Sequence, residues 1–146
     1  MGYTHYITHE SPFTSDEWKV VRKDVIAILK TAQADGLKIG NACGEKEITS
    51  EEAVGETEIC FDGLGVDSCE TFAINRIAEE WSFCKTARQP YDIAVTAILA
   101  YLEHNHPYKI SIGSDGDADD WEPGITLLKK ALGARASSIK PPLKVL

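Results

Sequence analysis

The feature that most constrains the fold is a long amphipathic helix predicted over residues 15–35. It opens with the four residues TSDE, in which Thr14 and Glu17 have the spacing of a capping box. Apolar side chains then recur at helical spacing from Trp18 to Ala32, and Gly36 follows as a typical C-terminal stop. Because such a helix must bury its apolar face, the rest of the chain has to supply a layer that covers it.

Strands are predicted to form that layer. They cover residues 2–8, 37–40, 57–63, 69–77, 81–87 and 108–113, where β-forming side chains gather between turn residues. Three of them, 57–63, 69–77 and 81–87, follow one another with short polar connections, which favours an antiparallel meander. Residues 41–56 are predicted to be an exposed loop.

Two further helices are predicted in the second half of the chain. The first covers residues 89–106, with Pro90 in its first turn and Asp92 where a negative charge complements the helix dipole. The second covers residues 121–133, with Asp119 or Asp120 as its cap and a stop at Gly133.

This order of elements predicts an α+β fold. We expect a mostly antiparallel sheet of about five or six strands, with two or three helices packed on one face. The length of 146 residues suits one domain, assigned to residues 1–136. Residues 137–146 contain two prolines and no periodicity, so they are predicted to be an extended tail, loosely attached or docked on a neighbouring copy in a homo-oligomer.

Charge and composition narrow the function. The net charge of −8 makes duplex DNA or an anionic membrane an unfavourable partner. The sequence has no apolar run near 18 residues and no recognisable signal peptide, so we expect no membrane span and a cytoplasmic location. The four cysteines form no C-x-x-C pair, which disfavours zinc and fits a reducing compartment. No cofactor is predicted.

The stretch WSFCKTARQPYD, residues 81–92, gathers cations and hydroxyls where a strand leads into a helix. Free backbone N–H groups at the helix start and the planar guanidinium of Arg88 suit a phosphate or carboxylate. Lys85, Thr86 and Tyr91 are the other candidates here. Strand alternation places Lys85 and Arg88 on opposite faces, so the alternative is a pair between Arg88 and Asp92 with Lys85 in solvent.

The amino-terminal strand supplies a second set of candidates. Tyr3 and His5 share one face with His9, whereas Tyr6 lies on the other with its threonine neighbours. Two tyrosines and a histidine can line a pocket that stacks a flat ring, although the same residues are also ordinary strand and core residues. His5 and His9 lack a nearby third ligand, so no metal site is predicted.

Other reactive residues carry weaker patterns. A nucleophilic Cys69 or Cys84 would need an activator such as His5, whereas buried inert cysteines are commoner. The acidic loop of residues 114–120 has the composition of a calcium loop but lacks the glycine and glutamate of an EF-hand at their places.

Four motifs in order resemble an uncharacterised family of small phage and bacterial proteins. They are MGYTHY at the start, CETF at 69–72, FCKTARQPYD at 83–92 and SDGDADDW at 114–121. The resemblance covers most of the chain, although many relatives carry a long insertion before the ETF motif that is compact here. The resemblance marks as motif members Tyr3, His5, Glu70, Thr71, Lys85, Thr86, Arg88, Tyr91, Asp92, Ser114 and Asp115.

The resemblance implies a phage setting and no catalytic role for a particular residue. Small phage proteins often counter host defence, for example by binding a nucleotide-like immune signal, and this extension to the present chain is an analogy. The leading hypothesis is therefore a protein that binds a small phosphorylated, nucleotide-derived molecule without turnover. Its predicted ligand-binding residues are Tyr3, His5, Tyr6, Lys85, Thr86, Arg88, Tyr91 and Ser114.

Two other hypotheses stay open at this point. The first is an enzyme that acts on a phosphorylated or nucleotide metabolite, with His5 as acid or base and Glu70 or Asp92 as its partner. The second is an inhibitor of a host protein that binds through the acidic surface or the C-terminal tail.

Overall fold

The structure is a computed structural model that describes residues 2–77, 81–142 and 144–145. It has the predicted α+β fold. Its elements are β1 (Thr4–His9), α1 (Ser15–Ala34), β2 (Ile39–Gly40), α2 (Ser50–Ala53), β3 (Glu58–Gly63), β4 (Phe72–Asn75), β5 (Trp81–Lys85), α3 (Asp92–Asn105), β6 (Ile110–Ser114), α4 (Ala118–Leu132) and β7 (Lys144–Val145). Short 3₁₀ turns follow β2, β3 and α4.

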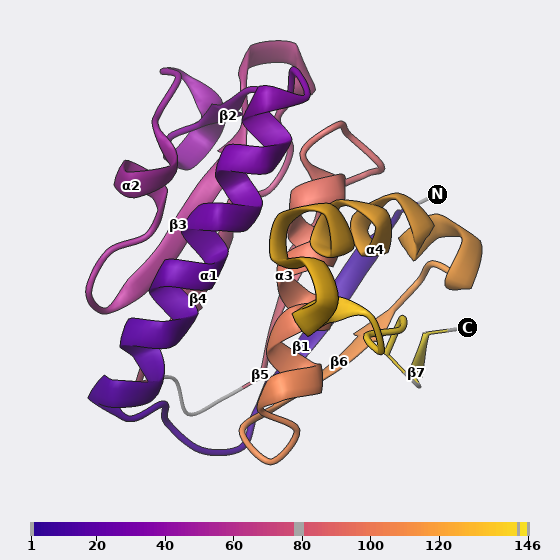
Figure 1. Ribbon diagram of the computed structural model, residues 1–146. Helices are drawn as coiled ribbons and strands as arrows, with labels where there is room; N and C mark the ends of the chain where they lie inside the picture. The colour runs from indigo at the N-terminus through magenta and orange to yellow at the C-terminus, as the bar shows by residue number, and fades with distance from the viewer. Residues whose placement is uncertain (1, 78–80, 143, 146) are drawn as a thin grey trace.

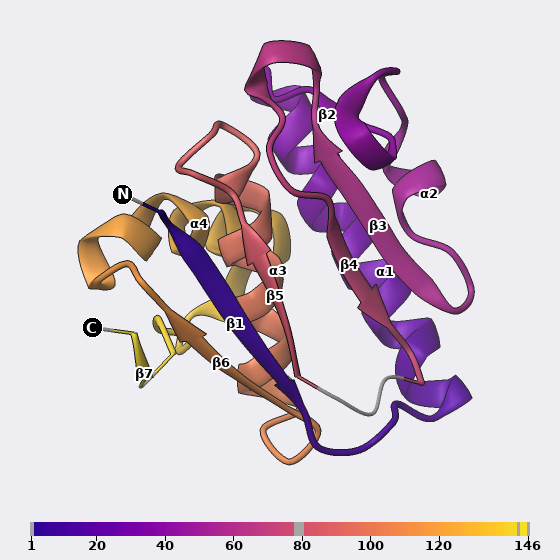
Figure 2. The same ribbon diagram turned by 180° about the vertical axis from the view of Figure 1, so that it is seen from behind.

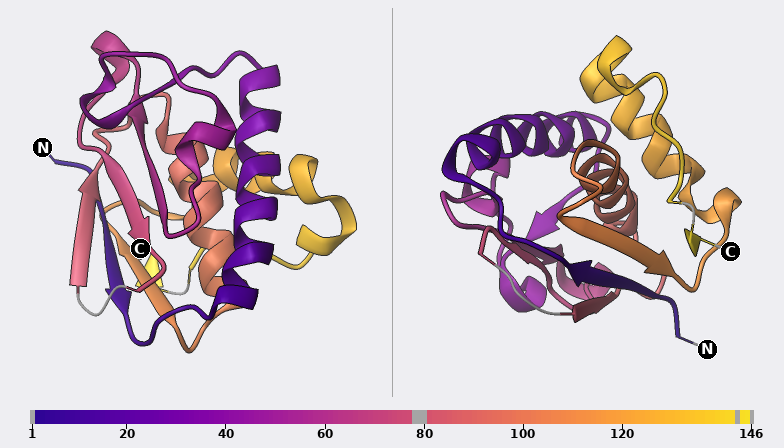
Figure 3. Two further views of the ribbon diagram at one scale, coloured as in Figure 1. Left: turned by 90° about the vertical axis from the view of Figure 1, so that its left-hand side faces the viewer. Right: turned by 90° about the horizontal axis from the view of Figure 1, so that it is seen from below.

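The strands form two small sheets where the sequence led us to expect one. One sheet has the order β5-β1-β6-β7 and the other has the order β2-β3-β4. They lie side by side (Figure 2), and the Glu70 N–H donates across to the Lys85 carbonyl at 3.1 Å. Helices α1, α3 and α4 lie on the same side of this layer (Figures 1 and 3), as predicted.

Helix α1 confirms the prediction made from its capping box. The Glu17 N–H donates to Thr14 Oγ1 at 3.1 Å, and the Thr14 N–H donates to Glu17 Oε1 at 2.8 Å. The helix ends at Ala34, and Gly36 has a φ of 102°, a conformation that favours glycine. Its apolar face joins the core that also contains Phe61 of β3 and Phe72 of β4.

Helix α3 is the centre of the molecule. Residues 94–102 are all buried, because α1 and α4 flank the helix and the β5-β1-β6-β7 sheet packs against it. Two hydrogen bonds to Asp24 of α1 tie the layer together, from Tyr101 Oη and from Arg135 Nη2, each at 2.6 Å. Among the described residues, no helix combines the length and the apolar character that a membrane span requires.

The predicted meander is only half correct. β3 and β4 pair antiparallel, but β5 pairs with β1, from Thr4 opposite Lys85 to Thr8 opposite Trp81. Strands that are neighbours in sequence pair often but not always. Pairing with β1 sets Cys84 opposite His5, so that both side chains are buried beneath the helices. Part of the predicted connection, residues 78–80, lies outside the described residues.

The predicted start of α4 was wrong by one turn. We expected the helix to begin at Trp121, two residues before Pro123. Instead Asp117 is the N-cap and accepts from the Asp120 N–H at 3.0 Å, while the Asp120 carboxylate accepts from the Asp117 N–H. This reciprocal pair stabilises an earlier start, and neither Asp119 nor Asp120 is the cap.

The segment 41–56, predicted to be an exposed loop, contains a 3₁₀ turn and helix α2. Thr49 and Glu52 form a second capping box there, and Ala53 and Val54 behind it are buried. The same T-x-x-E pattern that identified α1 was therefore present, but the four-residue helix has no periodic apolar run to reinforce it.

The C-terminal segment packs on its own chain. Ile139 is buried in the core, and β7 pairs parallel to β6, with Lys144 opposite Gly113. The described part of the tail is therefore docked rather than loosely attached. The homo-oligomer predicted through this tail stays a prediction.

The contact between α3 and α4 depends on Gly124. A Cβ atom there would lie 2.1 Å from Thr96 Oγ1 and 2.9 Å from the Ala97 backbone nitrogen. We expect Gly124→Ala to lower the free energy of unfolding by about 1–3 kcal/mol, because this overpacking outweighs the better helix propensity of alanine. Urea unfolding measures the change. Gly55→Ala is the control, since its Cβ would meet only the Glu58 carbonyl at 3.5 Å and should change stability by less than about 0.5 kcal/mol.

Candidate functional site

His5 is the centre of a buried polar cluster. It lies in the middle of β1, between β5 and β6, and its side chain is fully buried under α3 and α4. Its Nε2 atom is 2.6 Å from Asp92 Oδ1, and its Nδ1 atom is 2.8 Å from Ser114 Oγ. Residues from three distant parts of the sequence thus meet in one set of hydrogen bonds.

Asp92 occupies the start of α3, where the helix dipole favours a negative charge. Its Oδ1 atom accepts a second hydrogen bond from Thr86 Oγ1 at 2.7 Å. The backbone N–H groups of the same turn are also used, since Ala94 and Val95 both donate to the Tyr91 carbonyl. Most N–H groups at this helix start, which were predicted to meet a ligand phosphate, are therefore bonded within the chain, with the Asp92 carboxylate as the local anion.

Ser114 closes the cluster at the end of β6. Its Oγ atom accepts from the Gly116 N–H at 3.0 Å and from Trp121 Nε1 at 3.3 Å. With both lone pairs used, its proton is directed to Nδ1 of His5, and His5 then donates from Nε2 to Asp92.

Ser114, His5 and Asp92 are hydrogen-bonded in the same sequence as the nucleophile, base and orienting carboxylate of a catalytic triad. Ser114, however, is 7% exposed and its oxygen has no lone pair left for attack. The arrangement therefore ties β1, β6, α3 and α4 together. Glu70, the other predicted partner of His5, instead accepts from the Lys85 backbone N–H at 2.6 Å.

Tyr3 extends the cluster toward the surface. Its ring meets His5 edge-on at 5.1 Å between centroids, and it is 2% exposed. Its hydroxyl finds no hydrogen-bond partner among the described residues. Burial, followed by the nearby carboxylates of Asp92 and Asp120, raises the pKa of this hydroxyl, so Tyr3 is a neutral wall of the cluster.

Arg88 lies over Tyr3 and is paired with a carboxylate. Its guanidinium carbon is 4.2 Å from the Tyr3 ring centroid, and Nη2 is 3.3 Å from Asp120 Oδ2. Ala87 and Arg88 have φ values of 52° and 58°, which end the strand alternation and carry Arg88 to the surface. The alternative prediction, an ion pair between Arg88 and Asp92, was wrong. Arg88 pairs with Asp120, and Asp92 is hydrogen-bonded to His5 and Thr86.

The other predicted ligand residues lie elsewhere. Tyr6 and Lys85 are on the outer face of the sheet, where the Tyr6 hydroxyl donates to Asp115 Oδ1 at 2.9 Å. Tyr91 is fully buried and its hydroxyl donates to the Glu70 carbonyl, so its ring has no open face for a ligand. The structure thus joins five of the eight predicted residues: Tyr3, His5, Thr86, Arg88 and Ser114.

Cys84, one of the two cysteines considered as a nucleophile, lies in the interior, whereas Cys69 is exposed. Cys84 is buried, its thiol is 3.5 Å from the Glu70 carbonyl, and burial raises its pKa to about 12, so the thiolate is scarce at neutral pH. Within the described ranges, no group of three or more histidine, cysteine or acidic side chains is placed to hold a metal ion. Asp115 and Asp117 are engaged by Tyr6 and by the cap of α4.

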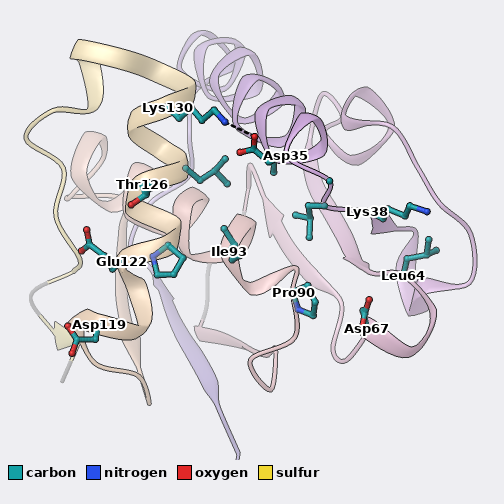
Figure 4. Close-up of a pocket in the computed structure, with 15 residues that line it drawn as sticks. Asp35, Lys38, Leu64, Asp67, Pro90, Ile93, Asp119, Glu122, Thr126 and Lys130 are labelled. Carbon is teal, nitrogen blue, oxygen red and sulfur yellow. Dashed lines mark hydrogen bonds and ion pairs between the residues drawn. The ribbon is translucent and has the colours of Figure 1, made fainter.

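A groove with a volume of about 950 Å³ lies next to the cluster, between α1, α3, α4 and the loop after β3 (Figure 4). Pro90 and Ile93, on either side of Asp92, line it, and Ile93 is 40% exposed. Its apolar lining comes from four separate segments: Leu37, Leu64, Pro90, Ile93, Pro123 and Leu127. Sequence reasoning missed this site, because no local pattern connects residues so far apart.

The rim of the groove is mostly acidic. Asp67, Asp119 and Glu122 are exposed along it, whereas Asp35 is neutralised by Lys130 Nζ at 2.5 Å. Lys38 is the other cation (Figure 4). The groove therefore offers an apolar surface within a mainly negative field.

Comparisons of this chain with protein-family models, with curated proteins and with solved structures found no match.

The hydrogen bonds of Ser114 can be tested by truncation. Ser114→Ala leaves the Gly116 N–H, the Trp121 indole N–H and His5 Nδ1 without their shared partner in a buried place. We expect the free energy of unfolding to fall by about 1–3 kcal/mol. Urea denaturation followed by tryptophan fluorescence measures this change. The exposed Ser138→Ala variant should stay within about 0.5 kcal/mol of the parent, and equal values for the two variants would contradict the assignment.

His9 predicts a pH dependence of stability. It is buried, and burial lowers its pKa below the ordinary value of 6.5. Below pH 6.5 the unfolded chain therefore binds a proton at His9 more readily than the folded chain does. The contribution of neutral His9 to folding stability is full above pH 6.5 and is lost as the pH falls toward the pKa of the folded state. We expect the stability advantage of the parent over His9→Gln to shrink between pH 7.5 and 5.5 in urea unfolding. A constant difference in stability between the parent and His9→Gln over this range would show that burial does not shift the pKa of His9.

Proposed function

We propose that this chain is a binding protein that holds a small molecule in the groove between α1, α3 and α4 without converting it. The observation that carries the proposal is the groove itself. Its volume lies in the range of small-molecule sites, about 300–1,000 Å³, and it combines an apolar lining with a few charged groups at the rim.

The hydrogen bonds of the buried reactive groups support binding without turnover. Catalysis by His5 would need a nitrogen that can exchange a proton with a substrate, but both nitrogens are bound inside the cluster. Ser114 and the Cys84 thiol are equally committed to partners in the interior. Binding therefore has stronger support than the alternative of an enzyme acting on a phosphorylated metabolite.

The charges of the groove indicate which ligands fit. Four carboxylates and two ammonium groups line it, so an apolar body with neutral or positive polar groups is favoured over a highly charged anion. The resemblance to small phage proteins extends the proposal to the sequestration of a nucleotide-derived host signal. In that case the base would lie on the apolar lining, and Lys38, or Arg88 after release from Asp120, would meet the phosphate.

The second candidate is an inhibitor that binds a basic segment of a host protein. It is favoured by the three exposed rim carboxylates of Asp67, Asp119 and Glu122, beside the exposed Ile93. A peptide with one apolar side chain between lysines would match this pattern. The two candidates differ in the mass of what is bound.

The groove proposal is tested by retention of small molecules from cell extract. The parent chain, Ile93→Arg and Val20→Arg are each dialysed against a low-molecular-mass extract and examined by native mass spectrometry. Val20 is a matched control, since it is an apolar helix residue with 54% exposure that does not line the groove. We expect the parent and Val20→Arg to retain the same molecule and Ile93→Arg to lose at least about 90% of it, because a long charged side chain would replace part of the apolar lining.

Release by denaturation separates the alternatives. An unchanged mass supports binding without turnover, whereas a product that accumulates with time shows an enzyme. Enrichment of no small molecule by the parent over Ile93→Arg would overturn the groove proposal. Capture of a basic peptide by the parent alone would favour the inhibitor.

A further inference from the structure

A second pocket, of about 400 Å³, lies at the opposite end of α1 from the groove. Its walls include Ser15, Lys19 and Arg22 from the first two turns of α1, and Thr57 and Arg76 beside β3 and β4. Glu56 is the single carboxylate of its lining. Three cations thus face one acid, in a chain whose net charge is −8.

Backbone carbonyls hold the two arginines in place. Arg22 Nε donates to the Val54 carbonyl at 2.9 Å, and Arg76 Nη1 donates to the Phe13 carbonyl at 3.0 Å. A guanidinium has five N–H donors, so each of these keeps further donors for a ligand. Both side chains are half-buried, which fixes their direction and strengthens their electrostatic interactions relative to those of a free surface arginine.

These two arginines differ from the others in their counter-ions. Arg88 is paired with Asp120 and Arg135 with Asp24. Over residues 2–77, 81–142 and 144–145, neither Arg22 nor Arg76 has a carboxylate within ion-pair distance, and Lys19 has only a 4.0 Å contact with the highly exposed Asp16. Two anchored guanidiniums that line one pocket and form no ion pair among these residues, with Glu56 as its single carboxylate, are suited to receive an anion.

We propose that this pocket binds the phosphate group of a small phosphorylated molecule. Arg22 and Arg76 would donate to its oxygens as planar forks, the hydroxyls of Ser15 and Thr57 would add neutral donors, and Lys19 would contribute its positive charge from the rim. The positive end of the α1 dipole, at Ser15, acts in the same direction. The volume exceeds that of the bare anion, so part of the attached group enters with it. This site is independent of the groove.

The test is calorimetric titration of the full chain at low ionic strength with inorganic phosphate, adenosine 5′-monophosphate and uncharged adenosine. We expect the monophosphate to bind, adenosine to give no heat, and affinity to fall with added salt. If inorganic phosphate binds as tightly as the monophosphate, the pocket is a site for the free anion. If inorganic phosphate binds more weakly, the ligand of the pocket is a phosphorylated molecule.

The variants locate the site. Arg22→Gln and Arg76→Gln should each weaken monophosphate binding about tenfold or more, since each loses charge-assisted hydrogen bonds. Lys23→Gln is the matched control on the next residue of α1, exposed and outside the pocket lining, and should change affinity less than about twofold. Because Arg22 and Arg76 also hold backbone carbonyls, Lys19→Gln provides a variant without such a bond, expected to weaken binding about threefold at low salt.

The outcomes are decisive in both directions. Loss of affinity in Arg22→Gln, Arg76→Gln and Lys19→Gln, with Lys23→Gln unchanged, supports the pocket. Binding that Arg88→Gln removes and Arg22→Gln leaves intact would assign the phosphate to the turn before α3 and overturn the proposal. Equal binding of adenosine and its monophosphate, or no heat from either phosphate with a folded parent chain, would overturn it as well.

Discussion

The rest of the structure depends on the hydrogen bonds that His5 makes inside the protein. Through Asp92 and Ser114 this one side chain connects the central strand β1 with the start of α3 and the end of β6. Trp121 adds α4 by donating to the same serine. A buried polar cluster of this kind stabilises the fold only when its members are satisfied, and here the hydroxyl of Tyr3 alone is left without a partner among the described residues.

This cluster separates structural from functional chemistry in the molecule. His5, Asp92 and Ser114 are hydrogen-bonded to one another in the interior, and the two surfaces proposed to meet a ligand lie at the two ends of α1. One is the apolar, mainly acidic groove, and the other is the basic pocket of Arg22 and Arg76. Their opposite charges suit different ligands, so the two proposals can succeed or fail separately.

The site residues show why motif reasoning reached only part of this arrangement. Strand alternation correctly placed Tyr3 and His5 on the other face of the strand from Tyr6. It could not show that Ala87 and Arg88 turn into the left-handed region, which moves the guanidinium onto Tyr3 and toward Asp120. Arg22 and Arg76 escaped notice because they are 54 positions apart and neither belongs to a local motif.

By itself the sequence determined what local interactions decide: the capping box of α1, the glycine stops of α1 and α4, the alternating faces of β1 and β5 and the α+β class. These depend on residues within a few positions of each other, so spacing and propensity suffice to predict them. Only the tertiary structure decided that β5 pairs with β1, that the strands divide into two sheets and that the C-terminal segment docks on β6. Those choices depend on which distant surfaces bury each other best, and neither pairing partners nor pockets are written in any single stretch of the chain.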